Sequence, residues 1–245
     1  MAQKTISKPP IGEAPGKKQA VADMFNSIAP RYDLLNRVLS AGIDQRWRRR
    51  VVKELRPYNP RRILDVATGT GDLALLLAKS FPEARVVGVD IAQAMLDRGQ
   101  EKVKEQGLTE RVKLQRGDSE KLPFSDRQFD AVTVAFGVRN FENLRKGLQE
   151  MKRVLKPGGH VAILEFSHPR AFPIRTLYWV YARHLLPRIG KWLSRHEAAY
   201  RYLPESVEVF PDGDDFLRVL EEVGFRTMRW IPLTGGIASI YVAEA

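Results

Sequence analysis

The chain has 245 residues, of which 44% are hydrophobic and 28% charged, as is typical of a globular protein with a substantial core. It contains no cysteine, which excludes disulfide scaffolds, cysteine-ligated metal sites and thiolate nucleophiles. No apolar run approaches the roughly 18 residues of a membrane-spanning helix. The first residues also lack the apolar stretch of a secretory signal, so a cytoplasmic protein is expected.

The net charge of +11 is unevenly distributed along the chain. Residues 1–62 contain 14 Lys or Arg against 5 Asp or Glu, and residues 170–201 contain 7 against 1. The remaining residues carry 19 basic and 23 acidic side chains. The sequence thus predicts a mildly acidic body with two basic segments. Such segments suit a polyanionic surface, either nucleic acid or anionic lipid, although solvated charge on helix faces gives the same count.

The N-terminal part of the chain is expected to be helical after a disordered tail over residues 1–18, which lack periodicity. Four apolar residues then have the i, i+3, i+4, i+7 spacing of a helix that Pro30 ends: Val21, Met24, Phe25 and Ile28. A second, basic helix is predicted over about Asp44–Leu55. Pro57 and Pro60 mark the boundary that follows it.

From Arg62 onward, short apolar runs alternate with helical patterns, which indicates βαβ units and a parallel sheet. Five runs are predicted strands: Ile63–Val66, Arg85–Asp90, Val112–Gly117, Phe129–Phe136 and His160–Phe166. Three segments between them are predicted helices, the third stopped by a Lys-Pro-Gly-Gly turn: Asp72–Lys79, Ala92–Gln106 and Phe141–Leu155. A helix over Asp214–Val223, capped by Gly224, precedes a terminal strand pair, Phe225–Ile231 and Ile237–Ala243. The predicted fold is α/β with a mostly parallel, seven-stranded sheet.

The segment between the first predicted strand and helix, Leu64-Asp65-Val66-Ala67-Thr68-Gly69-Thr70-Gly71-Asp72, has the composition of a cofactor-binding loop. Glycines let a ligand approach the backbone, and a helix N-terminus offers free N–H groups. The loop satisfies the dinucleotide pattern G-x-G-x-x-G/A, and Asp90 ends the next strand, so a nicotinamide dehydrogenase has to be weighed.

The charge of this loop argues against a dinucleotide. Asp65 and Asp72 would crowd an anionic pyrophosphate. They suit S-adenosylmethionine, which has no phosphate and carries an ammonium and a sulfonium. Asp90 would accept hydrogen bonds from its ribose hydroxyls. The loop therefore predicts an S-adenosylmethionine site.

Seven segments carry a resemblance to a known family: residues 25–36 (Phe-Asn-Ser-Ile-Ala-Pro-Arg-Tyr-Asp-Leu-Leu-Asn), the glycine loop, 117–124 (Gly-Asp-Ser-Glu-Lys-Leu-Pro-Phe), 136–140 (Phe-Gly-Val-Arg-Asn), 155–159 (Leu-Lys-Pro-Gly-Gly), 164–167 (Leu-Glu-Phe-Ser) and 200–206 (Tyr-Arg-Tyr-Leu-Pro-Glu-Ser). With them, nearly the whole chain from about Met24 resembles the quinone-biosynthesis C-methyltransferases. These enzymes act on demethylmenaquinone and on the polyprenyl benzoquinol precursor of ubiquinone. The glycine loop and the Lys-Pro-Gly-Gly turn occur in many methyltransferases, whereas residues 31–36 and 136–140 are far more specific.

The resemblance implies a Rossmann-like class I S-adenosylmethionine-dependent methyltransferase in one domain, residues 19–245, with a helical lid. The expected cofactor-binding residues are Asp65, Gly69, Thr70, Gly71, Asp90, Asp118 and Ser119, the last two at the adenine. Two positions depart from the family pattern. Ala135 stands where some members have a contact serine, and Ala67 replaces the first glycine of the general loop.

The family's reaction moves a methyl group from sulfur to a ring carbon of a reduced quinone. Ionising a quinol hydroxyl makes the adjacent ring carbon nucleophilic, and lowering a phenol-like pKa near 10 toward 7 requires on the order of 4 kcal/mol. Arg139 and Asn140, just beyond the fourth strand, are the expected catalytic residues that stabilise the oxyanion. Asn140 has an equally weighted rival role as N-cap of the helix that begins at Phe141.

The four histidines are sorted by the rule that ligands bind at the carboxyl ends of parallel strands. His160 opens its strand and is expected at the opposite end, whereas His168 follows that strand and can face the site. The quinol proton is expected to leave through a water, His168 or an acidic residue. His184 and His196 are predicted to be interfacial. No pair has metal-ligand spacing, so no metal is expected.

A basic, aromatic segment, residues 170–202, is predicted to complete the lid together with the N-terminal helices of residues 19–61. It holds 7 of the 22 aromatic side chains of the chain. The expected substrate-facing residues of the lid are Tyr32, Asn36, Tyr178, Tyr200 and Tyr202. Aromatics bordered by Arg and Lys suit a lipid interface, and they equally suit a stacking platform for RNA.

The favoured interpretation is C-methylation of demethylmenaquinol at the inner face of a membrane, with a polyprenyl quinol and an anionic lipid surface as partners and no nucleic acid. C-methylation of the 2-methoxy-6-polyprenyl benzoquinol stays open as the alternative, because the same site chemistry serves both rings. An RNA methyltransferase is the more distant alternative, without a thiolate route to C5 of a pyrimidine and without the Asn/Asp-Pro-Pro-aromatic motif. A non-catalytic module is disfavoured by the acids and Arg139. Isoprenoid length, the general base and the choice between monomer and homodimer are left open.

Overall fold

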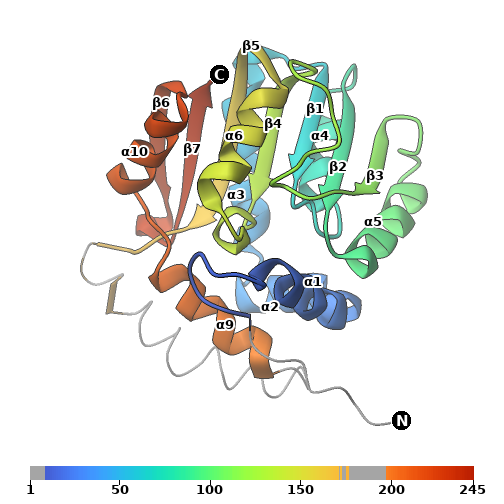
Figure 1. Cartoon of the computed structure of the whole chain (residues 1–245). Coiled ribbons are helices and arrows are strands. Elements are labelled where there is room, and N and C mark those ends of the chain that lie inside the picture. The colour runs from blue at the N-terminus through green and yellow to red at the C-terminus, as the bar shows by residue number, and fades with distance from the viewer. Residues whose placement is uncertain (1–8, 171, 173–174, 177–196) are drawn as a thin grey trace.

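The chain folds around one seven-stranded sheet that is covered by helices (Figure 1). The computed structural model describes residues 9–170, 172, 175–176 and 197–245. The strands are β1 (Arg62–Val66), β2 (Arg85–Asp90), β3 (Val112–Arg116), β4 (Phe129–Ala135), β5 (Leu155–Phe166), β6 (Arg226–Leu233) and β7 (Ala238–Glu244). Their order is β3-β2-β1-β4-β5-β7-β6, and all pairs are parallel except the two that β7 makes with β5 and β6. The predicted α/β fold with a mostly parallel seven-stranded sheet is confirmed.

Two layers of helices cover the sheet, one on each face. Because its strands are buried on both faces, their sequences are largely apolar. One face packs against α3 (Ile43–Leu55), α4 (Asp72–Ser80) and α5 (Gln93–Glu105), and the other against α6 (Leu144–Val154) and α10 (Asp214–Val223). In β1, Ile63 belongs to the first core cluster and its neighbour Leu64 to the second, as the alternation of side chains in a strand requires. The order of strands places a topological switch point between β1 and β4, where ligands bind at the carboxyl ends.

Helix α6 starts later than its sequence pattern predicts. It begins at Leu144, and its N-cap is Asn143, whose side chain accepts a hydrogen bond from the Lys146 N–H at 2.8 Å. The N-cap role considered for Asn140 is therefore wrong. This residue lies in a separate 3-10 turn, η3 (Val138–Asn140), where its Nδ2 donates to the Phe136 carbonyl at 3.3 Å and its Oδ1 has no partner.

The N-terminal region differs most from the prediction. Residues 9–18 were expected in a disordered tail, but α1 already begins at Lys17 (Lys17–Ile28), and the Lys17 side chain is buried. Helix α1 ends at Ile28, just before Pro30, as predicted, but the helical region continues because Pro is tolerated in a first turn. A 3-10 turn, η1 (Ala29–Arg31), and a helix that the sequence pattern missed, α2 (Tyr32–Leu39), follow it.

Helices α1, α2 and α9 (Glu197–Glu208) gather beyond the carboxyl ends of the strands, below the sheet in Figure 1. His160 lies at the opposite end, as predicted, and its ring stacks on Tyr58 with the centroids 3.4 Å apart. In the described part of the chain, no helix is both long enough and apolar enough to cross a membrane. The helices beyond the strands are what cover the switch point.

The close approach of the loops after β1 and β4 gives a test of this packing. A Cβ atom added at Gly137 would lie 2.6 Å from the Ala67 Cβ and 2.9 Å from a Val134 methyl. We expect Gly137→Ala to lower the free energy of unfolding by about 1–3 kcal/mol, because neither the Ala67 Cβ nor the buried Val134 methyl is the far end of a flexible side chain that could move aside. Urea denaturation measures this, with Gln149→Ala on the exposed face of α6 as the control. Unchanged stability of Gly137→Ala would contradict the described packing.

Candidate active site

The glycine loop after β1 lies at the switch point and turns sharply into α4. Ala67, Gly69 and Gly71 all have positive φ angles, of 51°, 57° and 79°. Gly71 is the N-cap of α4. Asp65 fixes the loop from below, since one carboxylate oxygen accepts from the Thr68 hydroxyl at 2.6 Å and the other from the Thr133 hydroxyl at 2.7 Å. These two bonds fix the loop to the ends of β1 and β4, and its Gly69 faces the cavity described next.

A cavity of about 80 Å³ lies against this loop, and we call it the polar cavity because charged as well as apolar side chains line it. It is lined by groups from the carboxyl ends of β1, β2, β3 and β4 and from α1, among them Gly69, Asp90, Asp118, Ser119, Asn140, Lys18, Phe25 and Tyr32. Asp90 accepts from the backbone N–H groups of Gly69 at 2.8 Å and Ala92 at 2.9 Å. Burial raises the pKa of the Asp90 carboxyl despite these bonds. A carboxylate has about four acceptor positions, so Asp90 can still accept from a ligand.

A larger, apolar cavity of about 340 Å³ adjoins the polar cavity. The two share Phe25, Tyr32 and Phe136 in their walls. The apolar cavity is lined by residues of α1, α2, α3 and α9 and by the ends of β4 and β5, among them Leu35, Asn36, Trp47, Arg139, Phe166 and Tyr202. Three of its aromatic rings pack together, with centroids 4.6–6.2 Å apart: those of Trp47, Phe136 and Phe166. Such a wall suits a flat, apolar ligand.

Phe136 forms part of both walls and has an unusual backbone conformation. Its φ angle is 61°, in the left-handed region that bulky residues rarely adopt. Strain of this kind clusters at functional sites and persists only where the surroundings enforce it. Here the Phe136 N–H is bound to the Leu164 carbonyl at 2.7 Å, and its own carbonyl accepts from Arg139. The strained residue thus connects the end of β4 to the η3 turn.

A buried ion pair joins the two strand ends beneath the apolar cavity. Arg139 Nη1 lies 2.7 Å from Glu165 Oε1 and 2.6 Å from the Phe136 carbonyl oxygen. The Glu165 side chain has no exposed surface and that of Arg139 is 6% exposed. Burial raises the pKa of Glu165, and the guanidinium and two backbone N–H groups oppose that rise. The pair holds Arg139 in one orientation, with its guanidinium 5.3 Å from the Phe166 ring centre.

Among the described residues, three buried side-chain polar atoms have no hydrogen-bond partner: Arg139 Nε, Asn140 Oδ1 and Tyr202 Oη. Asn140 lines the polar cavity, and Arg139 and Tyr202 line the apolar one. Buried polar groups are almost always satisfied, and each exception calls for an explanation. Two donors and an acceptor around adjoining cavities indicate that a polar ligand supplies the missing partners.

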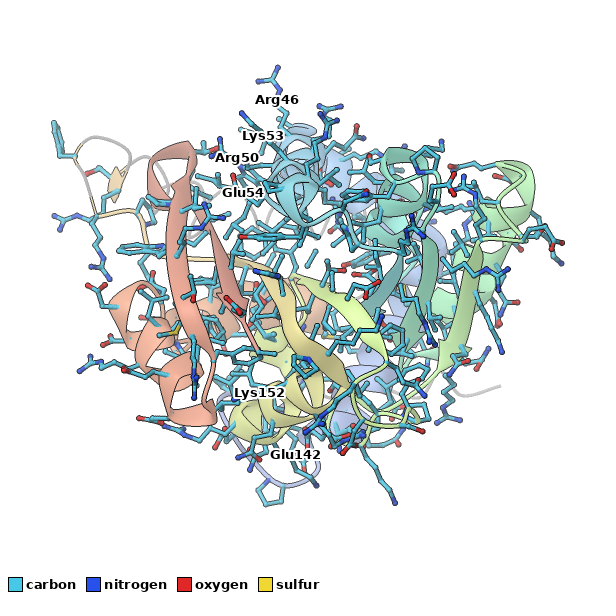
Figure 2. The ribbon with its side chains drawn as sticks, turned by 90° about the horizontal axis from the view of Figure 1, so that it is seen from above. Arg46, Arg50, Lys53, Glu54, Glu142 and Lys152 are labelled. Atoms are coloured by element: carbon cyan, nitrogen blue, oxygen red, sulfur yellow. The ribbon has the colours of Figure 1, made fainter. Side chains whose placement is uncertain are left out.

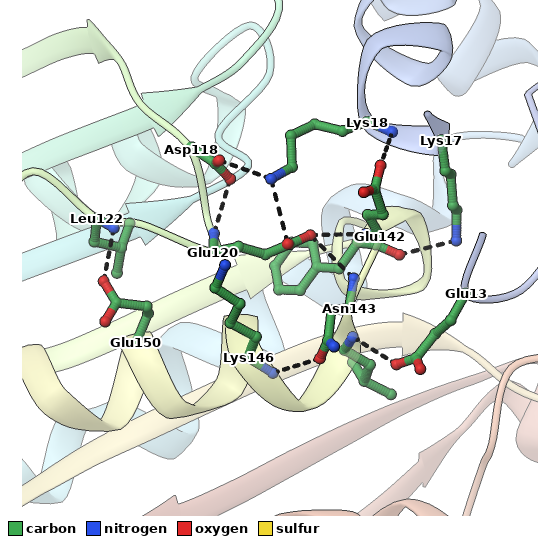
Figure 3. Close-up of polar contacts among 12 residues, drawn as sticks. Glu13, Lys17, Lys18, Asp118, Glu120, Leu122, Glu142, Asn143, Lys146 and Glu150 are labelled. Atoms are coloured by element: carbon green, nitrogen blue, oxygen red, sulfur yellow. Dashed lines mark hydrogen bonds and ion pairs between the residues drawn. The ribbon is translucent and has the colours of Figure 1, made fainter. Parts of the chain in front are cut away.

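An acidic network borders the polar cavity, as Figure 3 shows. Glu120 is buried and its Oε1 accepts from the backbone N–H groups of Glu142 and Asn143 at 2.9 and 3.0 Å. Lys18 Nζ donates to Asp118 at 2.7 Å and to Glu120 at 3.2 Å. Helix α1 is thereby fixed over the expected adenine side of the cavity.

The structure brings together most, but not all, of the predicted site residues. Gly69, Asp90, Asp118, Ser119 and Asn140 line the polar cavity, and Tyr32, Asn36, Arg139 and Tyr202 line the apolar one, with Tyr32 in both walls. Their roles as cofactor, catalytic and lid residues remain predictions. Tyr178, His184 and His196 lie outside the described residues, as does the side chain of Tyr200.

Four predicted site residues line neither cavity: Asp65, Thr70, Gly71 and His168. Asp65 is occupied by the two threonine hydroxyls described above. The buried Thr70 donates to Asp33 of α2 at 2.5 Å. His168 is turned toward Asp212, whose carboxylate lies 3.1 Å from its Nδ1. The direct catalytic role predicted for His168 therefore does not fit this geometry.

The two acids of the glycine loop, Asp65 and Asp72, do not face the polar cavity. Asp72 is paired with Lys102, which also contacts Asp33 and Thr70. Asp90, Asp118, Glu120 and Glu142 line the cavity instead. The expected acidic site, unsuited to a pyrophosphate, is therefore formed by Asp90 and Asp118, which were predicted, together with Glu120 and Glu142, which were not.

Sequence reasoning missed Glu165 and Lys17, although both left a signal. Glu165 follows four apolar residues of a strand buried on both faces, where a charge requires a partner. Lys17 precedes Val21 by four residues and so continues the apolar face of α1 backward.

Comparison with known proteins agrees with this architecture. The fold resembles that of the [4+2]-cyclase SpnF, with a TM-score of 0.70 and 17% identity over 97% of this chain and 98% of that one. It also resembles a SAM-dependent methyltransferase from Aquifex aeolicus, with a TM-score of 0.58 and 22% identity over 78% and 87% of the two chains. These likenesses place the chain among the Rossmann-like methyltransferase folds. They do not fix its chemistry.

Sequence similarity narrows the class. Residues 14–244 match the ubiE/COQ5 methyltransferase family, and the chain belongs to that family. The demethylmenaquinone methyltransferase of Deinococcus radiodurans is 47% identical over 97% of this chain and 98% of its own length. That of Bacteroides fragilis is 46% identical over 93% of both. The ubiquinone/menaquinone biosynthesis C-methyltransferase UbiE of Geotalea uraniireducens is 47% identical over 93% of this chain and 97% of its own.

The position of Asp65 gives a prediction about stability. Burial raises the pKa of its carboxyl from 3.8 to about 6, so the folded protein binds the proton more tightly than the unfolded chain does. The stability that this group contributes is present at low pH and is lost as the pH rises through about 6. We expect Asp65→Asn to abolish this fall and Asp65→Ala to cost about 1–3 kcal/mol, because two buried hydroxyls lose their acceptor.

Urea denaturation at several pH values between 4 and 7 checks both Asp65 variants. A difference between wild type and Asp65→Asn that is independent of pH would show that Asp65 is ionised throughout, against the described burial.

Proposed function

We propose that this protein transfers a methyl group from S-adenosylmethionine to a ring carbon of demethylmenaquinol, giving menaquinol. The observation that carries the proposal is the set of three unpartnered polar atoms around two adjoining cavities, one polar and acidic, the other aromatic. A reaction between a charged nucleoside and an apolar ring needs two such cavities with a shared wall. The names of the relatives support the naphthoquinol ring.

The polar cavity fits S-adenosylmethionine by the chemistry of its lining. Asp90 offers acceptors to ribose hydroxyls, and Asp118 and Ser119 stand where the family places the adenine. Its one lysine, Lys18, is already paired with Asp118 and Glu120, so the cavity has no cation to hold a pyrophosphate. Four acids in the lining favour a cationic ligand instead. When bound, S-adenosylmethionine supplies a methyl group already activated by its sulfonium.

Arg139 makes the ring carbon nucleophilic by stabilising the ionised quinol. Its Nε donor is unused, and the Glu165 pair keeps the guanidinium from turning away. A fixed cation beside a hydroxyl lowers the hydroxyl pKa, and the phenolate then pushes electron density onto the neighbouring ring carbon. Tyr202 Oη is a second unused group in the same wall, and Asn140 Oδ1 is an acceptor on the cofactor side.

Electrons and protons balance without a redox step. The ring carbon forms its bond to the methyl group as the methyl–sulfur bond breaks, and the sulfur keeps the electron pair. The same carbon then releases its proton, which restores the aromatic ring. The quinol hydroxyl loses its proton before this step and regains one after it. Arg139 remains protonated throughout, so it holds charge and does not act as the base.

Methylation of the 2-methoxy-6-polyprenyl benzoquinol is the second candidate. The relative from Geotalea uraniireducens is named for both the ubiquinone and the menaquinone route. The aromatic wall of Trp47, Phe136 and Phe166 favours the larger, two-ring naphthoquinol because it offers stacking area on several sides.

The decisive assay follows methyl transfer from labelled S-adenosylmethionine to reduced and oxidised demethylmenaquinone. We expect turnover of the reduced form only, since the quinone has no hydroxyl to ionise. Arg139→Ala should lower kcat by about 10²–10³-fold with little change in cofactor affinity. Arg139→Lys should recover part of kcat, and its charge keeps Glu165 paired.

Three results would contradict this account. Equal turnover of the oxidised quinone would refute the phenolate mechanism. Wild-type kcat in folded Arg139→Ala would remove Arg139 from the chemistry. Preference for the benzoquinol at equal concentrations would replace the naphthoquinol as substrate.

We infer in addition that the protein docks on an anionic membrane, where a polyprenyl quinol resides. Two apolar side chains of α2 are exposed one turn apart, Leu34 at 56% and Val38 at 44%, while Leu35 on the same helix lines the apolar cavity. The next helix, α3, presents basic side chains outward, and Figure 2 shows Arg46, Arg50 and Lys53 projecting away from the sheet. Exposed apolar side chains and outward Arg and Lys on two consecutive helices are features of a lipid interface.

Removing this surface should weaken vesicle binding. Each cation near an anionic leaflet contributes about 1 kcal/mol, so Arg46→Gln/Lys53→Gln should reduce co-sedimentation with phosphatidylserine-containing vesicles about tenfold or more. Leu34→Ser/Val38→Ser should reduce it further, and added salt should weaken the wild type. Lys104→Gln/Lys113→Gln, which removes two exposed charges elsewhere, is the control. Tight binding to structured RNA without vesicle binding would favour the RNA methyltransferase instead.

A further inference from the structure

Lys17 is the buried lysine of α1, and its ammonium group is the centre of a cluster of carbonyl groups. The residue is 2% exposed. Its Nζ donates to the backbone carbonyl oxygens of Gly12 at 2.7 Å, Arg139 at 2.9 Å and Phe141 at 3.0 Å. An ammonium has three N–H donors and the site provides three acceptors, so the cation is fully satisfied by the backbone.

Two of these three carbonyls belong to the end of the η3 turn and to the residue after it, so they flank Asn140, one of the expected catalytic residues. The Arg139 carbonyl lies on one side of Asn140 and the Phe141 carbonyl on the other. The 122 positions between Lys17 and Arg139 make this a long-range contact that holds the N-terminal segment against the active-site turn. The Lys17 side chain itself lines neither cavity, so it acts on the site only through the backbone that it binds.

The chain around Lys17 reinforces the contact, as Figure 3 shows. Glu13 accepts from the Leu144 N–H at 2.8 Å, and Glu142 accepts from the Lys18 N–H at 3.0 Å. Residues 13–18 and residues 139–144 are thus joined by hydrogen bonds in both directions. The segment is an integral part of the wall behind the η3 turn.

We propose that Lys17 is a positioning residue for the methyl-transfer reaction: its ammonium group clamps the backbone on both sides of Asn140 and so fixes the orientation of Asn140 and Arg139. This inference rests on the proposed function for its kinetic consequence. The clamp itself is a property of the folded chain, and it can be measured without substrate.

The charge of Lys17 titrates in an accessible range. Burial lowers the pKa of its ammonium from 10.5 to about 8, with a further lowering by the Arg139 cation. Glu13 on its own segment, Glu120 beyond β3 and Glu142 before α6 face it and oppose that change. Deprotonation leaves two N–H donors for three carbonyls, so the clamp weakens as the pH rises through about 8.

This titration separates positioning from stability. A lysine whose pKa is lowered by folding binds its proton more weakly in the folded protein than in the unfolded chain. Its contribution to the free energy of unfolding therefore rises between pH 8 and 10.5. As the pH rises above about 8, the weakened clamp should lower kcat, whereas the same deprotonation raises the free energy of unfolding. A fall in kcat in this range therefore cannot be due to a loss of stability from Lys17.

The test compares wild type, Lys17→Met, Lys17→Arg and the control Lys146→Met, an exposed lysine on α6. Hydrogen exchange of the peptide that contains residues 138–141 is measured first, without ligand. We expect faster exchange in Lys17→Met and wild-type exchange in Lys146→Met. In the quinol assay, Lys17→Met should have a kcat about 10–100-fold lower, with its affinity for S-adenosylhomocysteine within about threefold of wild type. Lys17→Arg should recover part of kcat, because a guanidinium keeps the charge.

The pH profile provides the readout that a purely structural role would not move. Wild-type kcat should fall above about pH 8, and this fall should be absent from Lys17→Met and Lys17→Arg. If Lys17→Met does not fold, the profiles of wild type and Lys17→Arg decide. Unchanged exchange together with unchanged kcat in Lys17→Met would overturn the inference, as would an alkaline fall that persists in Lys17→Arg. Faster exchange in an enzyme that does not methylate the quinol would leave the clamp standing and refute the proposed function.

Discussion

The buried ion pair between Arg139 and Glu165 is the interaction on which the rest of the site depends. Taking two charges out of water costs several kcal/mol per ion, and only good geometry with further hydrogen bonds offsets that cost. Here the Phe136 carbonyl accepts from Arg139, and the Arg139 and Phe166 N–H groups donate to Glu165, while Arg139 Nε stays without a partner. Replacing a buried ion pair by apolar residues of similar volume is often neutral or stabilising, so stability is a weak explanation for this pair. It keeps a cation fixed beside an aromatic cavity.

The sheet topology explains why the pair lies where it does. β4 and β5 are parallel neighbours, so the residues just past their carboxyl ends come side by side. The η3 turn after β4 carries Arg139, and Glu165 lies near the end of β5. The glycine loop after β1 and Asp90 at the end of β2 reach the same edge. The polar cavity thus spans the switch point at the ends of β1 and β4, and the apolar cavity lies beyond the ends of β4 and β5, with Phe136 in both walls.

Much of the sheet was predictable, because strands buried on both faces leave uninterrupted apolar runs such as Val161–Leu164. Asp90 and Arg139 could be placed near the site for the same reason, as both follow such runs. The N-terminal region was harder. The sequence around Lys17 is polar, so it shows no apolar pattern. The segment is held in place by hydrogen bonds to residues more than 100 positions away, which a local sequence pattern cannot predict. Asp65 and His168 line neither cavity and have partners that the sequence did not reveal, because strand position says which end of the sheet a side chain occupies, but not which partner it meets there.

A crystal structure of the protein with S-adenosylhomocysteine and a reduced naphthoquinol bound tests the central claim most directly. The account predicts ribose hydroxyls within hydrogen-bond distance of Asp90 and a quinol oxygen at Arg139 Nε, with Asn140 Oδ1 and Tyr202 Oη also partnered. The naphthalene ring should lie against Phe136 and Phe166. A complex in which both ligands are bound while these three atoms still lack partners would contradict the account.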